Sequence, residues 1–309
     1  MKIAIIGTGA MGMAFGNMLA REGEDVLMIS ASRKSSADSI NENGITMTDD
    51  LGEHHARVRA ALAGTVREKR DLLVLFTKAY GTGEVLEKCT DMIGPDTYIM
   101  TLQNGLGNVE LAAQYVPKSR IICGVVTTAA ETTGPGQVRS RLDRHGQIYM
   151  ADGKYDPFLE EVSEVFTRSG VTLEINENIE GAIWGKLAIN ASFNPVTALC
   201  RVSQDKLLEV PGAVELITGI MDEVISFASS QGVSVDREKY IGRAKTIMST
   251  HRGHYPSMAQ DVMRGRPTEI ENISGEILRR AHDAGFPMPK TETVYTLMKI
   301  MEKGIGADD

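Results

Sequence analysis

The chain has 309 residues, enough for about two domains, and its 42% hydrophobic and 24% charged residues are those of an ordinary globular protein. The formal net charge of −8 disfavours proteins that bind nucleic acid or anionic membranes through a basic surface. The three cysteines have neither CxxC nor zinc spacing, and no targeting or membrane-spanning stretch is visible, so we expect a cytoplasmic protein without a metal site.

The first elements form a strand, helix and strand pattern. Residues 2–6 predict a buried parallel strand, residues 13–21 a helix and residues 25–30 a second strand. Between the first strand and the helix stands the GxGxxG motif Gly7-Thr8-Gly9-Ala10-Met11-Gly12. Its glycines permit a tight turn, close approach of a pyrophosphate and packing of the helix on the strand, and the helix N-terminus attracts the phosphates. The motif therefore predicts a dinucleotide-binding loop at residues 7–12.

The residues after the second strand indicate which dinucleotide binds. An NAD-binding fold places Asp or Glu there, to bind the ribose hydroxyls. This chain has Ser30-Ala31-Ser32-Arg33-Lys34 instead. Arg33 and Lys34 carry the positive charge that a 2′-phosphate requires, so we predict NADP(H) rather than NAD(H). The alternative is that these two cations only face solvent.

The alternation of strands and helices continues to residue 175 and then stops. Strands are predicted at 71–76, 97–102, 120–126, 147–150 and 171–175, a helix near 83–92 and a loop at 133–136. From residue 176 on the pattern predicts only helices, at 177–191, 212–230, 236–250, 268–284 and 291–303. The predicted fold class is α/β plus all-α: a Rossmann-type doubly wound sheet over residues 1–175, which binds the dinucleotide, and a helical substrate and catalytic domain over residues 176–309.

Polar residues at two strand ends and on one helix face are further candidates for a site. Lys78 and Asn104 follow predicted strands, where ligands of open α/β sheets bind. Lys186, Asn190 and Asn194 are four residues apart, so a helix places them on one face. Each of these residues is by itself equally compatible with a solvent-facing position.

A second polar segment of the helical half surrounds a predicted helix start. Thr268 and Glu271 have the spacing of a capping box, and Glu269 falls in the first turn, where a carboxylate is favourable. The alternative is that Glu269 only stabilises the start of the helix and has no role in a functional site.

Taken together, several short motifs resemble those of the ketopantoate reductase (2-dehydropantoate 2-reductase) family over nearly the full length. They are GTGAMG at 7–12, TKA at 77–79, QNG at 103–105, WGKLAIN at 184–190, NP at 194–195, SMAQD at 257–261 and GRPTEIE at 265–271. The resemblance implies NADPH-dependent reduction of ketopantoate to (R)-pantoate, a step of pantothenate and coenzyme A biosynthesis.

The resemblance also implies roles for individual residues. Lys186 is then the general acid and Glu269 the carboxylate that engages the substrate and supports that lysine. Lys78 and Asn104 lie near the nicotinamide ribose and the reacting carbon, and Asn190, Asn194 and Ser257 bind the hydroxyl and carboxylate ends of the substrate.

One departure from the family pattern keeps alternatives open. The family usually has an arginine directly after the second strand, where this chain has Ala31 and, slightly later, Arg33. One alternative is therefore a D-2-hydroxyacid dehydrogenase of the same family that uses NAD(H) and another 2-keto acid. A more remote one is a non-enzymatic module that senses a dinucleotide. The expected partner is a small 2-keto acid, and both a monomer and a homodimer are compatible with the sequence.

Overall fold

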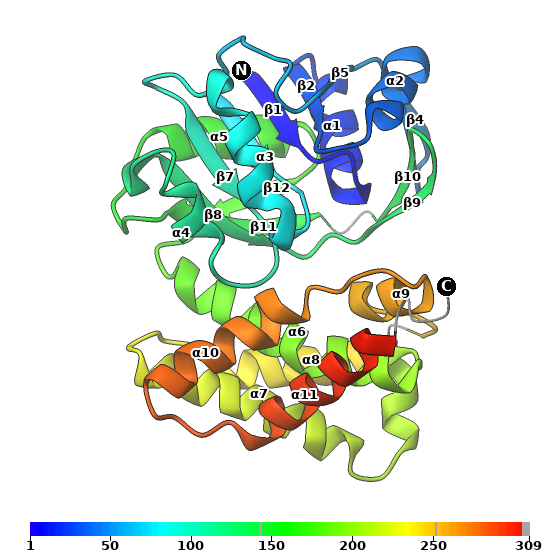
Figure 1. The fold of residues 1–309 in the computed structure, drawn as a ribbon, viewed down its shortest axis with the longest axis vertical. Helices are drawn as coiled ribbons and strands as arrows, with labels where there is room; N and C mark the ends of the chain where they lie inside the picture. The colour runs from blue at the N-terminus through cyan, green and yellow to red at the C-terminus, as the bar shows by residue number, and fades with distance from the viewer. Residues whose placement is uncertain (142–143, 251, 305–309) are drawn as a thin grey trace. The chain divides into compact units, whose positions relative to one another are not determined.

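The chain folds into two compact units, in a computed structural model that describes residues 1–141, 144–250 and 252–304 (Figure 1). Residues 1–103 and 108–179 form the first unit, and residues 104–107 join the chain from Glu180 onward in the second. The predicted fold class is confirmed, because the first unit holds a mostly parallel sheet and the described part of the second contains helices without strands. The predicted boundary at residue 175 and the roles of the two domains stay predictions.

The main sheet of the first unit has eight strands in the order β12-β11-β8-β7-β6-β1-β2-β5. All neighbours are parallel except β11 and β8. From β5 to β8 the order along the chain is 3-2-1-4-5-6, the order of dinucleotide-binding folds. The strands are β1 Lys2–Ile6, β2 Asp25–Ser30, β5 Arg59–Leu62, β6 Leu72–Leu75, β7 Tyr98–Thr101, β8 Ile121–Val126, β11 His145–Met150 and β12 Thr172–Ile175.

A second, smaller sheet of the first unit packs against the helix that follows β1. Its order is β4-β3-β10-β9, with β3 Ile45–Asp49, β4 Gly52–Ala56, β9 Ala130–Gly134 and β10 Gln137–Ser140. The fully buried Asn17 of α1 donates to the Ile45 carbonyl at 2.8 Å and to the His54 carbonyl at 3.0 Å. The helices of this unit are α1 Ala10–Arg21, α2 Lys34–Asn43, α3 Thr82–Lys88, α4 Asn108–Ala112 and α5 Phe158–Arg168, with 3₁₀ turns at Ala79–Gly81, Thr90–Met92 and Lys118–Arg120.

The second unit is built around the helix α6, Ile179–Cys200. This helix continues through Pro195, nine residues past its predicted end at 191, because Phe193 and Ala198 are fully buried and tertiary packing outweighs the cost of the proline. Its other helices are α7 Ala213–Ser230, α8 Arg237–Thr250, α9 Ser257–Met263, α10 Glu276–Asp283 and α11 Pro289–Gly304, with a 3₁₀ stretch at Gln204–Glu209 and a π-helical turn at Glu271–Gly275.

The predicted capping box at Thr268 is wrong. The Thr268 amide and hydroxyl both bond to Glu302 of α11, at 3.2 and 2.6 Å. Glu271 instead accepts from the Tyr295 hydroxyl and pairs with Lys299 at 2.6 Å. The box depends on α-helical spacing, and here the first turn is π-helical, so an acid from a distant helix takes the expected place.

Two other expectations for the first unit need correction. The predicted helix at 83–92 breaks at Cys89 into α3 and a 3₁₀ turn. Half of the predicted loop at 133–136 is the end of β9, and Pro135 and Gly136 form the predicted turn to β10. The helices α2, α4 and α5, the strand β5 and the small sheet had no counterpart in the sequence prediction.

Candidate functional site

The glycine loop between β1 and α1 leaves an open backbone at the helix N-terminus. A Cβ on Gly7 would lie 2.8 Å from the Phe76 carbonyl, and Gly7 has φ +124°. A Cβ on Gly12 would lie 2.0 Å from the Gly7 oxygen, so α1 packs directly on the turn. Gly9 is exposed and has no atom within 4 Å of an added Cβ. This is a cradle into which a phosphate group fits, beside the free amides of α1.

The end of β2 provides positive charge next to this loop. The buried Ser30 accepts a hydrogen bond from Thr8 at 3.5 Å and donates to the Arg33 carbonyl at 2.8 Å, which ties the loop to the turn before α2. Arg33 precedes α2 and Lys34 is its first residue, and both side chains are exposed. Neither has an ion-pair partner among the residues that the structure describes. Two unpaired cations thus stand where an NAD-binding fold has an acid.

The two predicted strand-end residues belong to different units. Lys78 follows β6 in the first unit, is half-buried, and its carbonyl accepts from the Gly81 amide at 2.9 Å. Gln103 donates to the Thr77 carbonyl at 2.7 Å, also in the first unit. Asn104, the next residue, belongs to the second unit. The sequence did not predict that a strand-end asparagine packs with the helical half of the chain.

The predicted polar stripe of α6 is present in the second unit and includes Asn104. Asn190 donates to the Asn104 side-chain oxygen at 3.4 Å, and Lys186 is half-buried one turn before it. Asn194, one turn further along α6, is only 5% exposed.

The environment of Lys186 brings the pKa of its ammonium group close to the physiological range while leaving it mostly protonated at pH 7. Burial lowers the pKa of Lys186 to about 8, the charge of Arg243 acts in the same direction, and Glu269 opposes both. Lys186 forms no hydrogen bond or ion pair with a described residue. An acid with a pKa near the working pH is the kind that general acid catalysis needs.

The remaining predicted residues flank this stripe on other elements of the second unit. Glu269 is 8% exposed and stands two residues before the π-helical turn. Ser257 is the exposed first residue of α9. The predicted site residues thus fall into two groups, one in each unit, with Asn104, Lys186, Asn190, Asn194, Glu269 and Ser257 all in the second.

Sequence reasoning missed two features near these residues. The first is the π-helical turn, whose Asn272 carbonyl accepts from the Leu106 amide at 3.1 Å and lies 2.3 Å from where a Cβ on Gly105 would be. It thereby fixes the segment that carries Asn104. The second is Arg243 of α8, which no motif pointed to and which acts on Lys186 only because two helices pack together.

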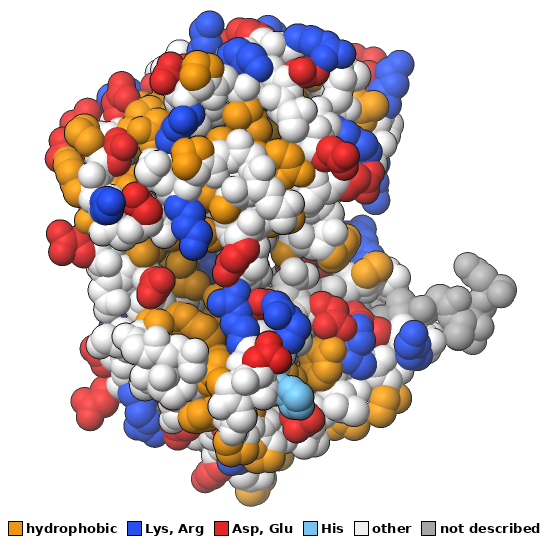
Figure 2. All heavy atoms as spheres, turned by 60° about the vertical axis from the view of Figure 1, so that its left-hand side comes forward, with side chains coloured by type: hydrophobic (Ala, Val, Ile, Leu, Met, Phe, Trp, Pro, Cys, Tyr) orange, Lys and Arg blue, Asp and Glu red, His pale blue; other side chains and the backbone are white. Residues whose placement is uncertain are grey.

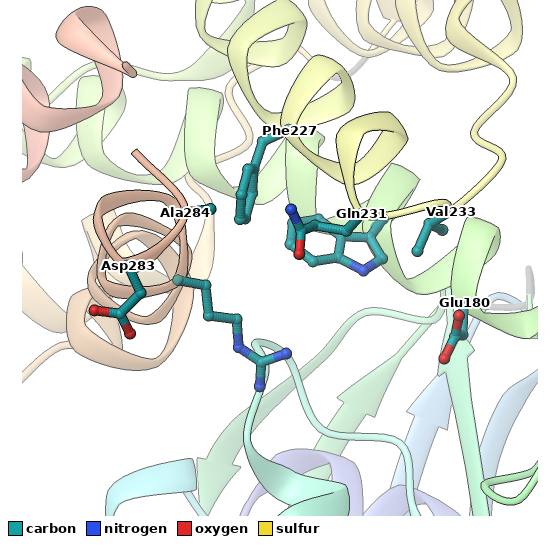
Figure 3. Close-up of a pocket in the computed structure, with 8 residues that line it drawn as sticks. Glu180, Phe227, Gln231, Val233, Asp283 and Ala284 are labelled. Atoms are coloured by element: carbon teal, nitrogen blue, oxygen red, sulfur yellow. The ribbon is translucent and has the colours of Figure 1, made fainter. Parts of the chain in front are cut away.

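A hollow of about 500 Å³ in the second unit lies apart from the predicted residues. Figure 3 shows Asp283 and Ala284 on one side of it, Val233 and Glu180 on the other, and Phe227 and Gln231 between them. Trp184 and Arg280 complete its lining. None of the predicted site residues lines it.

The described residues can be compared with what a metal ion, a membrane and a nucleic acid each require. No described group of His, Cys, Asp or Glu could hold a metal ion. None of the helices in the described ranges has the length and hydropathy to cross a bilayer. Figure 2 shows Lys and Arg interspersed with Asp and Glu, so the described part of the displayed face offers no broad basic surface of the kind that nucleic acids require.

Comparisons with known proteins cover nearly the whole chain. The family model described as ketopantoate reductase PanE/ApbA matches residues 3–154, and the model of its C-terminal part matches residues 178–302. The 2-dehydropantoate 2-reductase of Pyrococcus horikoshii is 32% identical over 302 residues, 98% of each chain. The enzyme of the same name from Streptococcus pyogenes is 27% identical over 307 residues, again 98% of each chain.

Two solved structures show the same fold. A D-mandelate dehydrogenase with NADH and anilino(oxo)acetate is 29% identical, with a TM-score of 0.92 over 99% of this chain and 100% of that one. A 2-dehydropantoate 2-reductase from Geobacter metallireducens is also 29% identical, with a TM-score of 0.90 over 97% of this chain and 99% of that one. On the family models and the full-length relatives, the chain belongs to the ketopantoate reductase family of oxidoreductases.

Proposed function

We propose that this protein reduces ketopantoate to (R)-pantoate with NADPH. The single observation that carries this proposal is Lys186, a half-buried amine with a pKa of about 8 that has no hydrogen-bond partner among the described residues. It shares its unit with Asn194, which is 5% exposed, and with the Asn190 and Asn104 pair. That set suits a ketone with polar groups on both sides of the reacting carbon. The full-length relatives named 2-dehydropantoate 2-reductase support the choice of ketopantoate.

In the proposed mechanism the protein supplies charge, a proton and orientation. NADPH, when bound, supplies the hydride. The Lys186 ammonium stabilises the negative charge that grows on the ketone oxygen and donates its proton there. Asn190, Asn194 and Ser257 orient the substrate so that the carbonyl faces that ammonium. Glu269 keeps Lys186 charged, since it is the group that raises the pKa of this lysine.

The dinucleotide is bound by the first unit. Residues 7–12 hold the pyrophosphate at the N-terminus of α1, where Gly9 leaves the space for it. Arg33 and Lys34 bind the 2′-phosphate, and Lys78 meets the ribose or phosphate near the nicotinamide. The preference for NADPH rests on the two exposed cations and on the absence of an acid between Ser30 and Lys34.

Cofactor choice is tested with the variants Arg33→Gln and Lys34→Gln. Each loses charge-assisted bonds to the 2′-phosphate, so we expect the KM for NADPH to rise roughly 10- to 100-fold while the KM for NADH stays unchanged. Lys154→Gln, which removes an exposed cation of the same unit, is the control for net charge. Equal effects on both dinucleotides would contradict the assignment.

Substrate choice is tested by steady-state kinetics of the purified protein with both dinucleotides. We expect the highest kcat/KM for ketopantoate with NADPH, and we expect Lys186→Ala to lose most of kcat while still binding NADPH. The second candidate is a D-2-hydroxyacid dehydrogenase, favoured by the likeness to a D-mandelate dehydrogenase solved with NADH. A higher kcat/KM for phenylglyoxylate, the keto acid of mandelate, with NADH would favour that candidate. A protein that binds a reduced dinucleotide but turns over neither acid would indicate a sensing module.

A further inference from the structure

Helix α8 packs against α6 directly beside Lys186. A Cβ on Gly185 would lie 2.0 Å from the Tyr240 ring, so only glycine allows this approach. The Tyr240 hydroxyl donates to the Ala182 carbonyl at 3.4 Å, and the tyrosine is 7% exposed. The contact therefore fixes α8 at the residue that immediately precedes Lys186.

Arg243 stands one helical turn beyond that contact. Tyr240, Ala244 and Met248 form the buried face of α8, and Arg243 lies at its edge with an exposed side chain. Burial is the main cause of both neighbouring shifts: it lowers the pKa of Lys186 and raises that of Tyr240, and the charge of Arg243 adds to the first shift and opposes the second. Yet Arg243 itself has no hydrogen bond or ion pair with the described residues. A guanidinium without a carboxylate partner among the described residues thus belongs to the helix that packs against Gly185, the residue before the proposed acid.

The charge of the substrate requires such a group. A 2-keto acid carries a full negative charge on the carboxylate attached to its ketone carbon, and a carboxylate that leaves water needs a positive partner. The predicted substrate binders Asn190, Asn194 and Ser257 are neutral. Lys186 is engaged with the ketone oxygen in the proposed mechanism, which leaves the carboxylate without a cation of its own.

We propose that Arg243 binds the carboxylate of the 2-keto acid, while Lys186 serves the neighbouring ketone oxygen. This assignment rests on the proposed function. The two oxygens lie on adjoining carbons of the substrate, and the two cations belong to helices that contact each other at Gly185 and Tyr240. A planar guanidinium can hold a carboxylate through two parallel hydrogen bonds, so Arg243 also selects 2-keto acids over neutral ketones.

The test compares an acid with its uncharged ester. For Arg243→Gln we expect the KM for the 2-keto acid to rise roughly 10- to 100-fold, because one charge-assisted pair is lost, and the KM for its methyl ester to match that of the wild type. Arg243→Lys, which keeps the positive charge but cannot form two parallel hydrogen bonds from a planar group, should recover part of the affinity for the acid. Lys245→Gln is the matched control, since Lys245 is an exposed cation on the opposite side of α8. Equal losses for acid and ester, or none for either, would overturn the assignment.

A binding measurement separates this inference from the proposed function. Oxamate resembles a 2-keto acid but is not reduced, so its affinity does not depend on turnover. Calorimetry with either reduced dinucleotide present should show oxamate binding to the wild type and Lys245→Gln, and binding at least about tenfold weaker to Arg243→Gln. If the wild type reduces no 2-keto acid but this difference persists, the proposed function fails and the role of Arg243 stands. Equal affinities, or no binding by the wild type, would refute that role.

Discussion

Reduction of the ketone should slow as the pH rises through about 8, the value to which burial lowers the pKa of Lys186. The shift from 10.5 corresponds to about 3 kcal/mol against the ammonium form. At pH 7 about ten ammonium groups exist for each amine, and at pH 9 about one for ten. Because reduction uses the ammonium and the reverse oxidation uses the amine, kcat for reduction should fall through this range while kcat for oxidation rises.

Two substitutions should move this midpoint in opposite directions. Glu269→Gln removes the charge that raises the Lys186 pKa, so the midpoint should move to lower pH. Arg243→Gln removes a charge that lowers it, so the midpoint should move to higher pH. Lys186→Arg, which does not titrate in this range, should show residual activity without the transition. The assay is the initial rate in both directions between about pH 6 and pH 10. A flat wild-type profile, or shifts of the same sign in both charge variants, would refute the reasoning.

Further predictions concern stability and dinucleotide binding. Lys186→Met removes a poorly solvated amine, so the free energy of unfolding from chemical denaturation at pH 7 should increase by up to about 3 kcal/mol. A decrease would contradict the unfavourable burial of the Lys186 ammonium group. Between the folded-state pKa of Lys186, about 8, and its ordinary value of 10.5, the unfolded wild type binds more protons than the folded protein, so its stability should rise with pH. This rise should be absent in Lys186→Met. Gly185→Ala should lower the free energy of unfolding by about 1–3 kcal/mol, because its Cβ overpacks against the Tyr240 ring. Gly242→Ala, on open helix surface, should raise the free energy of unfolding by up to about 1 kcal/mol. Similar values for both would contradict the close contact of the two helices. Gly12→Ala should lower thermal stability because its Cβ meets a loop carbonyl, whereas Gly9→Ala should keep stability and weaken NADPH binding in a titration; unchanged binding would remove Gly9 from the pyrophosphate site.

Local patterns were sufficient where neighbouring residues decide the structure. The run at residues 2–6 predicts a buried strand, and the spacing of Gly7, Gly9 and Gly12 predicts the turn that the structure contains. Likewise, the four-residue spacing of Lys186, Asn190 and Asn194 needs only helix geometry to place them on one face of α6. These features depend on the period of a strand or helix, which the pattern of neighbouring residues in the sequence reveals.

Local patterns failed where segments distant in the chain decide the structure. The small sheet pairs β3 with β10, about ninety residues apart, and its short strands pack against α1. Glu302 takes the capping position that spacing assigned to Glu271, because α11 brings its carboxylate to Thr268.

The amino-acid sequence by itself determined the fold class, the glycine loop and the polar face of α6, since each follows from local geometry and residue type. Only the tertiary structure decided that Asn104 packs with the helical unit and bonds to Asn190, and that Arg243 acts on Lys186. The physical reason is that a pKa and a side-chain contact depend on which groups folding brings within a few ångströms, regardless of their separation along the chain.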